Sequence, residues 1–348
     1  MRIFPTLMIA CISIGCNPSS SPTLTSLFTE VQSPDSARLP IEPDDILQPV
    51  LLASRDSLLV CTNHLTKKAL RVYNLNNGDH RDLVHIGKAE NELLTASAIW
   101  FSDDALNVYG VNTGKILQIP AEQLFRPQPA MHAIPFPKGL FNLSASPTND
   151  RYAAPNSLTQ DPDAKQFTLL DERGQAITYF GNYPHTDSRI HPRESALIYQ
   201  GKLAVSPSAT KVIYASQFGS VFRFFDISQS GDIRLDREYR FCEPSYISDS
   251  DPSKQRYSVR WTEDCRAGAL AIAPTESGCF ILCEENKPVS DKNWRIPTVY
   301  EFDWNGNALR RLCLGRNVQT IAYNKERRQL IALTVNDRNE YSFVAYRL

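Results

Sequence analysis

A short hairpin unit recurs along the chain, and this repetition limits the fold more than any other feature of the sequence. In "VYEFDWNGNALRRLCLG" at 299–315, two runs of alternating apolar residues flank an Asn-Gly turn. Comparable units occur at 69–87, 105–120, 167–181 and 221–241, and a further short strand precedes most of them. Repeats of about 45 residues with four strands each are typical of β-propeller blades.

Six such repeats can be placed along the chain. Their innermost strands are expected in "ASAIWFS", "LFNLSAS", "GKLAVSP", "YSVRWTE" (257–263) and "VQTIAYN". The repeats lie at 46–87, 93–136, 138–181, 197–241, 257–315 and 317–348. The sequence therefore predicts an all-β fold, a six-bladed β-propeller with four-stranded antiparallel blades. A two-sheet sandwich is the alternative, but it gives no reason for six similar units.

The last repeat lacks an outer strand, because the chain stops at the third strand of that blade. An open ring would leave an unpaired strand edge there. The apolar run "LTSLFTEVQ" at 24–32 is predicted to supply the missing strand and so to close the ring. A single propeller domain is thus expected over 24–348. Helix signals are weak, with one turn expected after Pro120.

The N-terminus differs from the rest of the chain. Arg2 is followed by an apolar stretch from Ile3 to Ile14. This stretch is too short to cross a bilayer and is typical of a signal peptide. The following "SIGC" resembles a bacterial lipobox, which implies cleavage before Cys16 and a lipid on its sulfur. We therefore expect a signal peptide at 1–15, a tether at 16–23 and a lipid bilayer as partner through Cys16. An ordinary secretory signal, or modification at Cys11, is the alternative.

Six cysteines remain in the mature chain. Four of them, Cys61, Cys279, Cys283 and Cys313, lie in apolar strand-like runs and are expected to pack as small hydrophobic side chains. Cys242 and Cys265 flank a polar segment and could form one disulfide bridge. No CxxC pair indicates structural zinc, so we expect no metal.

Two groups of polar residues are candidate binding sites. The first, "KAENE", contains Lys88, Asn91 and Glu92 at a blade junction, where loops are expected to crowd the axis of the ring. The second, "PHTDSRIHPRE", contains His185, Asp187 and His191 in one loop. Ordinary turn chemistry and solvated loop residues are the respective alternatives.

Two further features are weaker signals. Asp249 and Asp251 in "CEPSYISDSDPSKQ" could hold Ca²⁺ through their carboxylates, although the segment lacks the Gly and distal Glu of an EF-hand. Trp294 is expected in a loop, whereas Trp100, Trp261 and Trp304 are expected to pack between blades.

Two stretches resemble the six-bladed, TolB-like propeller lipoproteins of Bacteroidetes. The stretch at 198–227 is similar to a blade of that family at Tyr199, Gly201, the Ser206-Pro207 pair and Lys211. The stretch at 85–109 is similar at Gly87 and Glu92, but it lacks the second glycine and the proline of the family's Gly-rich loop. The resemblance implies an extracytoplasmic, membrane-tethered propeller.

The sequence favours a binding or scaffold module of the cell envelope, facing the periplasm or the cell surface. The net charge of -1 offers no basic surface for nucleic acid. No GxSxG, HExxH or phosphate-loop motif nominates a catalytic residue, and no cofactor is expected. We expect a monomer that binds a protein, peptide or glycan. The alternative is a hydrolase or lyase with its active site in the axial channel, because propellers host both classes.

Overall fold

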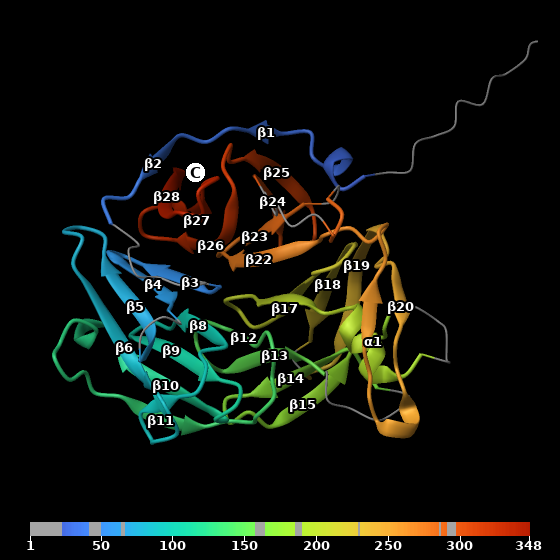
Figure 1. Ribbon diagram of the computed structural model, residues 1–348, viewed down its shortest axis with the longest axis horizontal. Coiled ribbons are helices and arrows are strands. Elements are labelled where there is room, and N and C mark those ends of the chain that lie inside the picture. The colour runs from blue at the N-terminus through green and yellow to red at the C-terminus, as the bar shows by residue number, and fades with distance from the viewer. Residues whose placement is uncertain are drawn as a thin grey trace, which may run out of the picture.

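Six β-sheets are arranged around a common centre in the computed structural model of the chain (Figure 1). The structure describes residues 23–41, 50–63, 67–156, 164–184, 190–228, 230–284, 287–290 and 297–348. Each of these sheets is one blade, and the strands of its own repeat run in chain order from the innermost to the outermost. The predicted six-bladed propeller with four-stranded antiparallel blades is therefore confirmed.

The first three blades follow one another from residue 52 to residue 180. Blade one contains β3 (Leu52–Arg55), β4 (Leu58–Thr62), β5 (Lys68–Asn74) and β6 (His80–Ile86), with β7 (Glu92–Leu93) added in parallel beside β6. Blade two contains β8 (Ala98–Phe101), β9 (Ala105–Gly110), β10 (Lys115–Pro120) and β11 (His132–Pro135). Blade three contains β12 (Ser144–Ala145), β13 (Arg151–Pro155), β14 (Phe167–Asp171) and β15 (Ala176–Phe180).

The other three blades complete the ring. Blade four contains β16 (Gly201–Val205), β17 (Lys211–Ser216), β18 (Ser220–Ile227) and β19 (Ile233–Cys242). Blade five contains β22 (Ala269–Pro274), β23 (Gly278–Cys283), β24 (Thr298–Asp303) and β25 (Ala308–Cys313). Blade six contains β26 (Val318–Asn324), β27 (Gln329–Val335) and β28 (Tyr341–Arg347).

The Asn-Gly turn between β24 and β25 shows how the sequence sets the hairpins. Asp303 Oδ1 accepts hydrogen bonds from the backbone N–H groups of Asn305 and Asn307, each at 2.8 Å. Gly306 adopts a φ of +77°, which residues with a Cβ rarely adopt. A Cβ at this position would also lie 2.7 Å from the ring of Phe224 in the neighbouring blade. The glycine therefore permits both the turn and the close approach of two blades.

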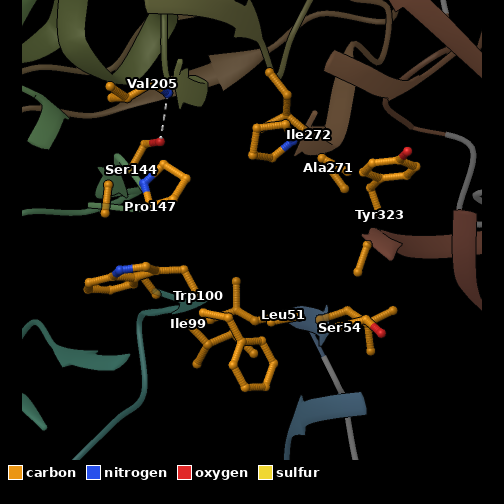
Figure 2. Close-up of a pocket in the computed structure, with 18 of the residues that line it drawn as sticks. Leu51, Ser54, Ile99, Trp100, Ser144, Pro147, Val205, Ala271, Ile272 and Tyr323 are labelled. Carbon is orange, nitrogen blue, oxygen red and sulfur yellow. Dashed lines mark hydrogen bonds between the residues drawn. The ribbon is translucent and has the colours of Figure 1, made fainter. Parts of the chain in front are cut away.

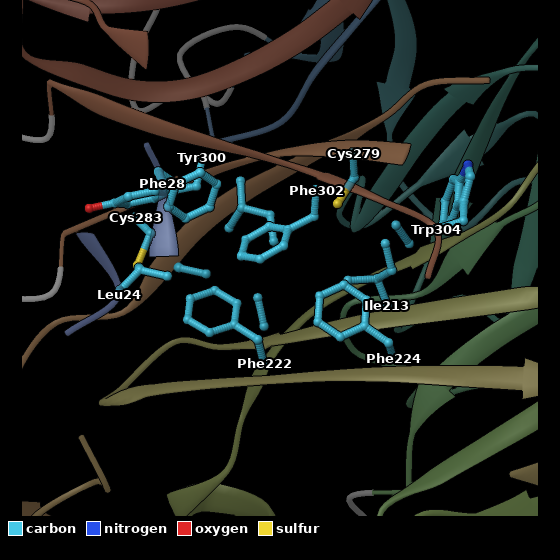
Figure 3. Packing of buried hydrophobic residues seen from close by; sticks show 14 residues of the cluster. Leu24, Phe28, Ile213, Phe222, Phe224, Cys279, Cys283, Tyr300, Phe302 and Trp304 are labelled. Atoms are coloured by element: carbon cyan, nitrogen blue, oxygen red, sulfur yellow. The ribbon is translucent and has the colours of Figure 1, made fainter. Parts of the chain in front are cut away.

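The hydrophobic core lies between the blades. Among the described residues, six clusters of buried apolar side chains occur, one at each junction between neighbouring blades. At the junction of blades four and five, Phe222 and Phe224 from β18 face Phe302 from β24 (Figure 3). A single twisted sheet could not bury both of its faces, so each blade depends on its two neighbours.

The ring is closed by an N-terminal strand, but by a different segment from the one predicted. β2 (Ser36–Arg38) pairs antiparallel with β28 and so provides the outer strand of blade six. The predicted segment 24–32 lies beside blade five instead, where β1 (Val31–Gln32) pairs in parallel with β25. Its apolar residues Leu24 and Phe28 are buried in the cluster between blades four and five. Its apolar pattern thus reflects packing against two blades, through the short 3₁₀ helix η1 (Thr25–Leu27).

The segment between blades four and five contains an additional hairpin. It consists of β20 (Tyr246–Ser248) and β21 (Val259–Trp261), with the 3₁₀ helix η3 (Pro252–Lys254) at its tip. The prediction that 257–263 forms the innermost strand of blade five is therefore wrong, because β22 occupies that place. Trp261 stacks on Phe218, with 3.9 Å between the ring centroids, outside the ring of blades.

Helical structure is sparse in the described ranges. The predicted turn after Pro120 is the 3₁₀ helix η2 (Ala121–Gln123), and the α-helix α1 (Pro192–Ile198) precedes blade four. Among the described residues, no helix has the length and apolar character that a membrane span requires.

Candidate functional site

A channel of about 510 Å³ runs along the axis of the ring, and the innermost strands of all six blades line it. β3, β8, β12, β16, β22 and β26 each contribute residues to its wall. Figure 2 shows the labelled side chains surrounding an open centre, with Ile99 and Leu51 on one side and Ile272 and Val205 on the other. The repeated fold therefore creates one site to which every blade contributes.

The wall of the channel is mostly apolar. It includes Leu51, Ile99, Leu203, Val205 and Ile272. Trp100 also lines it, and its indole Nε1 donates a hydrogen bond of 2.7 Å to Asn149 Oδ1. Such a wall can contact an apolar ligand, while the polar ends of the channel determine its orientation.

The inner strands expose one edge toward the channel, and polar side chains satisfy part of it. Ser144 Oγ of β12 accepts a hydrogen bond of 3.1 Å from the backbone N–H of Val205 in β16, shown by the dashed line in Figure 2. An unpaired strand edge is a site for unwanted pairing, so this contact also protects β16. It links blade three to blade four across the channel wall.

One end of the channel, which we call the lysine mouth, contains Asn142 and Lys202. Asn142 precedes β12, and Lys202 is the second residue of β16, so both lie near the starts of inner strands. Lys202 Nζ donates a hydrogen bond of 3.2 Å to Asn142 Oδ1. Burial lowers the pKa of Lys202, because a desolvated ammonium is disfavoured. No ion pair to Lys202 occurs among the residues that the structure describes.

The opposite end, which we call the ion-pair mouth, contains Arg55, Glu276, Lys325 and Glu326. All four lie at or just after the ends of inner strands. Lys325 Nζ lies 2.8 Å from Glu276 Oε1, and this contact raises the pKa of Lys325. Arg55 Nη1 donates to the carbonyl of Ser102 at 2.7 Å. Glu326 Oε2 accepts from the backbone N–H of Asp56 at 3.1 Å, so charges here connect neighbouring blades.

The first predicted group lies on the outside of blade one. Glu92 belongs to β7, which pairs with the outermost strand β6, so the expectation that this junction crowds the axis is wrong. Glu92 Oε2 accepts from the backbone N–H of Ala89 at 3.0 Å, which closes a tight turn. Lys88, Asn91 and Glu92 do not line the channel. A binding role for them stays a prediction.

The second predicted group is only partly covered by the described residues, because His185 and Asp187 lie outside them. His191 caps the start of α1, where its Nδ1 accepts from the backbone N–H of Arg193 at 3.2 Å. Its ring also stacks on Tyr257, with centroids 4.0 Å apart. His191 thus has a clear structural role, and its role in binding stays a prediction.

The two aspartates predicted as Ca²⁺ ligands lie in or beside the additional hairpin. Asp249 forms an ion pair with Arg260 at 3.2 Å, and Asp251 forms one with Lys254 at 3.1 Å. Within the described ranges, no group of three His, Cys, Asp or Glu side chains is placed to hold a metal ion. Trp294 lies outside the described residues.

Three of the four cysteines expected in apolar strands, Cys61, Cys279 and Cys283, are buried, and Cys313 is half-buried. Burial raises the pKa of Cys61 to about 12 and raises that of Cys279 further, so both thiols stay protonated near neutral pH. Burial also raises the pKa of Cys265, with a smaller contribution from the nearby Cys242. The bridge between these two cysteines is not formed in this structure.

None of the binding residues predicted from the sequence lines the described channel, and Lys202 and Asn142 at its lysine mouth were not among the predicted candidates. Lys202 lies within "GKLAV", which was correctly expected to be an innermost strand. A lysine within an otherwise apolar innermost strand was the available signal, because such a strand faces neighbouring blades and the channel, with little access to bulk solvent.

No known protein family matches the sequence, and no curated protein matches it either. Among solved structures, hydrazine synthase of Kuenenia stuttgartiensis is similar at 11% identity and a TM-score of 0.46, over 87% of this chain and 97% of that one. The β-propeller domain of Cps50 (Swd1) from Myceliophteria thermophila is similar at 12% identity and a TM-score of 0.44, over 86% and 97%. Likenesses at this level carry no argument about function.

Proposed function

We propose that this chain is an extracytoplasmic, lipid-anchored β-propeller that acts by binding, and that the axial channel is its binding site. One observation carries the proposal: the inner strands of all six blades enclose a channel of about 510 Å³ with a mostly apolar wall. Ligand pockets of roughly 300–1,000 Å³ with apolar walls and a few polar groups are typical of small-molecule sites.

Binding is favoured over catalysis by the chemistry of the described channel wall. General acid–base or nucleophilic catalysis needs a reactive group beside a second group that activates or orients it. Lys202 has a lowered pKa, but its hydrogen-bond partner in the channel is the neutral amide of Asn142. The alternative function, a hydrolase or lyase in the channel, would use Lys202 as its base.

The proposed membrane anchor rests on the lipobox-like "SIGC" and on Cys16, which lies outside the described residues. An anchor at Cys16 would keep the propeller close to the membrane, because only residues 17–22 separate Cys16 from Thr23, the first described residue. Such a short segment spans at most about 25 Å. Labelling of cells with a radioactive fatty acid should mark the wild-type protein but not a Cys16→Ala variant. Equal labelling of both proteins would refute anchoring at Cys16.

The partner is proposed to be a molecule of the cell envelope, with a protein, peptide or glycan engaging the mouth of the same channel. The resemblance of 198–227 to TolB-like propeller lipoproteins supports an envelope location, as do the signal-like residues at 1–15. We expect the protein to be a monomer, which sedimentation of the purified chain can test.

The binding site can be tested by filling the channel from two sides. Ile99→Trp and Ile272→Trp each place a larger ring in the channel, and Ile177→Trp is the matched control because Ile177 is exposed on the outermost strand β15. The proteins would be purified from envelopes after crosslinking and examined by native mass spectrometry. We expect wild type and Ile177→Trp to retain a bound molecule that both channel variants lose.

Two outcomes would contradict this proposal. Retention of the same molecule by both folded channel variants would place the binding site elsewhere. Turnover of that molecule by the wild type, lost in Lys202→Met, would favour the hydrolase or lyase instead.

A further inference from the structure

We infer that the channel binds an amphipathic carboxylate, a ligand with one negative charge and an apolar body, whose carboxylate is held by Lys202 and Asn142. This inference rests on the proposed function and names the chemical class of its ligand. It follows from the placement of charged side chains at the two mouths, from the donors at the lysine mouth and from the apolar wall between them.

The charged side chains of the channel are divided unequally between its two mouths. Among the described lining residues, the ion-pair mouth holds two cations with three carboxylates, whereas Lys202 is the charged side chain of the lysine mouth; the former group is Arg55, Lys325, Asp103, Glu276 and Glu326. Arg55 lies 3.7 Å from a carboxylate oxygen of Asp56, and Lys325 lies 2.8 Å from one of Glu276. Lys202 has only an amide oxygen as its partner in the described part of the chain. A partly buried ammonium without a counter-charge is unfavourable, so an anion at this place would be stabilised.

The donors at the lysine mouth suit a carboxylate. An ammonium has three N–H donors, and the hydrogen bond to Asn142 Oδ1 uses one of them. The amide nitrogen of Asn142 provides two more donors beside the ammonium, because its oxygen already faces Lys202. A carboxylate has two oxygens, so one can accept from each side chain.

The net charge of the ligand's head group also favours a carboxylate over a phosphate. A carboxylate carries one negative charge, whereas a phosphate monoester carries about 1.5 to 2 at neutral pH. The second charge of a phosphate would have no cation at the lysine mouth, and the cations of the ion-pair mouth already have partners. A monoanion therefore fits the described residues better than a dianion.

The apolar wall of the channel favours an apolar body for the rest of the ligand. From the lysine mouth, the channel continues past Ile99 and Ile272 toward the far ends of the inner strands. These side chains offer dispersion contacts and few hydrogen-bonding groups, which favours an aliphatic or aromatic body. The whole ligand would thus lie along the axis, with its charged end at the start of β16.

The inference can be tested with dodecanoate, used below its micellar concentration, and isothermal titration calorimetry on the purified chain. Lys202→Met removes the ammonium and retains an unbranched side chain. Lys165→Met is the matched control, because Lys165 Nζ also donates to an asparagine oxygen, that of Asn182 at 2.7 Å, but it is exposed and outside the channel. We expect Lys202→Met to weaken dodecanoate binding at least tenfold and Lys165→Met to leave it unchanged.

Two related ligands separate charge from apolar contact. Dodecanol has the same chain without the charge, and dodecyltrimethylammonium carries the opposite charge. We expect both to bind the wild type more weakly than dodecanoate, and we expect Lys202→Met to leave dodecanol binding unchanged. Equal binding of dodecanoate by wild type and Lys202→Met would overturn the inference, as would equal binding of dodecanoate and dodecanol by the wild type.

Failure of this inference is distinguishable from failure of the proposed function. If the molecule retained from envelopes is lost in Ile99→Trp and Ile272→Trp but retained in Lys202→Met, the channel binds a ligand that is not a carboxylate. If neither tryptophan variant affects its retention, the channel is not the binding site at all.

Discussion

The two mouths of the axial channel use charged side chains differently. At the ion-pair mouth, Lys325 of blade six contacts Glu276 of blade five, and Glu326 of blade six contacts the backbone of Asp56 in blade one. At the lysine mouth, Lys202 of blade four contacts the neutral Asn142 of blade three. Both mouths connect neighbouring blades, but only the first also neutralises its lysine within the described chain.

This difference separates two kinds of polar residue in a repeated fold. A charge that is neutralised by the next blade stabilises the ring, and its removal leaves a partner behind. A partly buried charge without a counter-charge opposes folding, and it persists only if it serves another purpose. The lysine mouth is therefore the part of the channel whose polar residues are least explained by stability, in keeping with the proposed binding role.

The largest effect on stability is expected at Asn324, beneath the ion-pair mouth. This side chain is fully buried, and its Nδ2 donates to Ser54 Oγ at 2.7 Å and to the carbonyl of Asp56 at 3.0 Å, which joins blade six to blade one. Asn324→Ala should lower the free energy of unfolding by about 2 to 3 kcal/mol, because buried hydrogen-bonding groups lose their partners. Urea denaturation measures this change.

Asn142→Ala at the lysine mouth is the control for that experiment. Asn142 is partly exposed and its side-chain oxygen accepts a hydrogen bond of 3.2 Å from Lys202, so its loss should lower stability much less. An equal loss in both variants would remove the distinction between the two mouths.

A smaller effect of opposite sign is expected at Lys202. Burial lowers the pKa of Lys202 in the folded state. Between that pKa and the ordinary pKa of lysine, the unfolded chain therefore binds more protons than the folded chain. The free energy of unfolding of the wild type rises with pH in this window. Lys202→Met removes the buried charge and should raise the free energy of unfolding at neutral pH by roughly 0.5 to 2 kcal/mol.

The pH dependence tests the cause of that gain. The difference in the free energy of unfolding between Lys202→Met and wild type should be largest below the pKa of Lys202 in the folded state. It should decrease as the pH approaches the ordinary pKa of lysine. Denaturation curves at several pH values measure it. A variant less stable than wild type at neutral pH would mean that the ammonium contributes to folding and would contradict the comparison.

The smallest effect is expected at Lys325, on the surface of the ion-pair mouth. Its ion pair with Glu276 is exposed to solvent on both sides, so it is screened by salt. Lys325→Met should leave the unfolding midpoint within the error of the measurement at 0.15 M salt, with a detectable decrease only at low ionic strength. A large loss of stability at physiological salt would show that this contact matters more than its exposure indicates.

The repetition of the fold was predictable from sequence because it depends on local patterns. Alternating apolar residues and the turn at Asn305-Gly306 specify a hairpin wherever it lies, and β24 and β25 form where they were expected. The segment 257–263 has the same alternation, yet it forms one strand of the additional hairpin. Alternation predicts a strand but does not identify its neighbours, and that information lies in contacts such as the stacking of Trp261 on Phe218.

The ring closure and the channel were harder to predict for the same physical reason. The apolar residues Leu24 and Phe28 indicate a buried segment, and they are indeed buried. They pack against two blades around a 3₁₀ turn and not as a strand. The closing strand is formed by the more polar Ser36–Arg38. Lys202 and Asn142 are sixty residues apart and meet only because successive inner strands start at the same end of the axis. Their significance depends on the finished ring.

The closing strand has a consequence for the biosynthesis of the chain. β2 precedes the six repeats in the sequence and its partner β28 is the last strand of the sixth, so every strand between the two must be made before Ser36, Ala37 and Arg38 find their partners at Tyr346, Ala345 and Val344. Pairing across such a sequence distance is slow, and until it occurs the last blade offers an unprotected edge to other chains. Newly made protein should therefore be prone to aggregation until β28 has been made and has paired with β2.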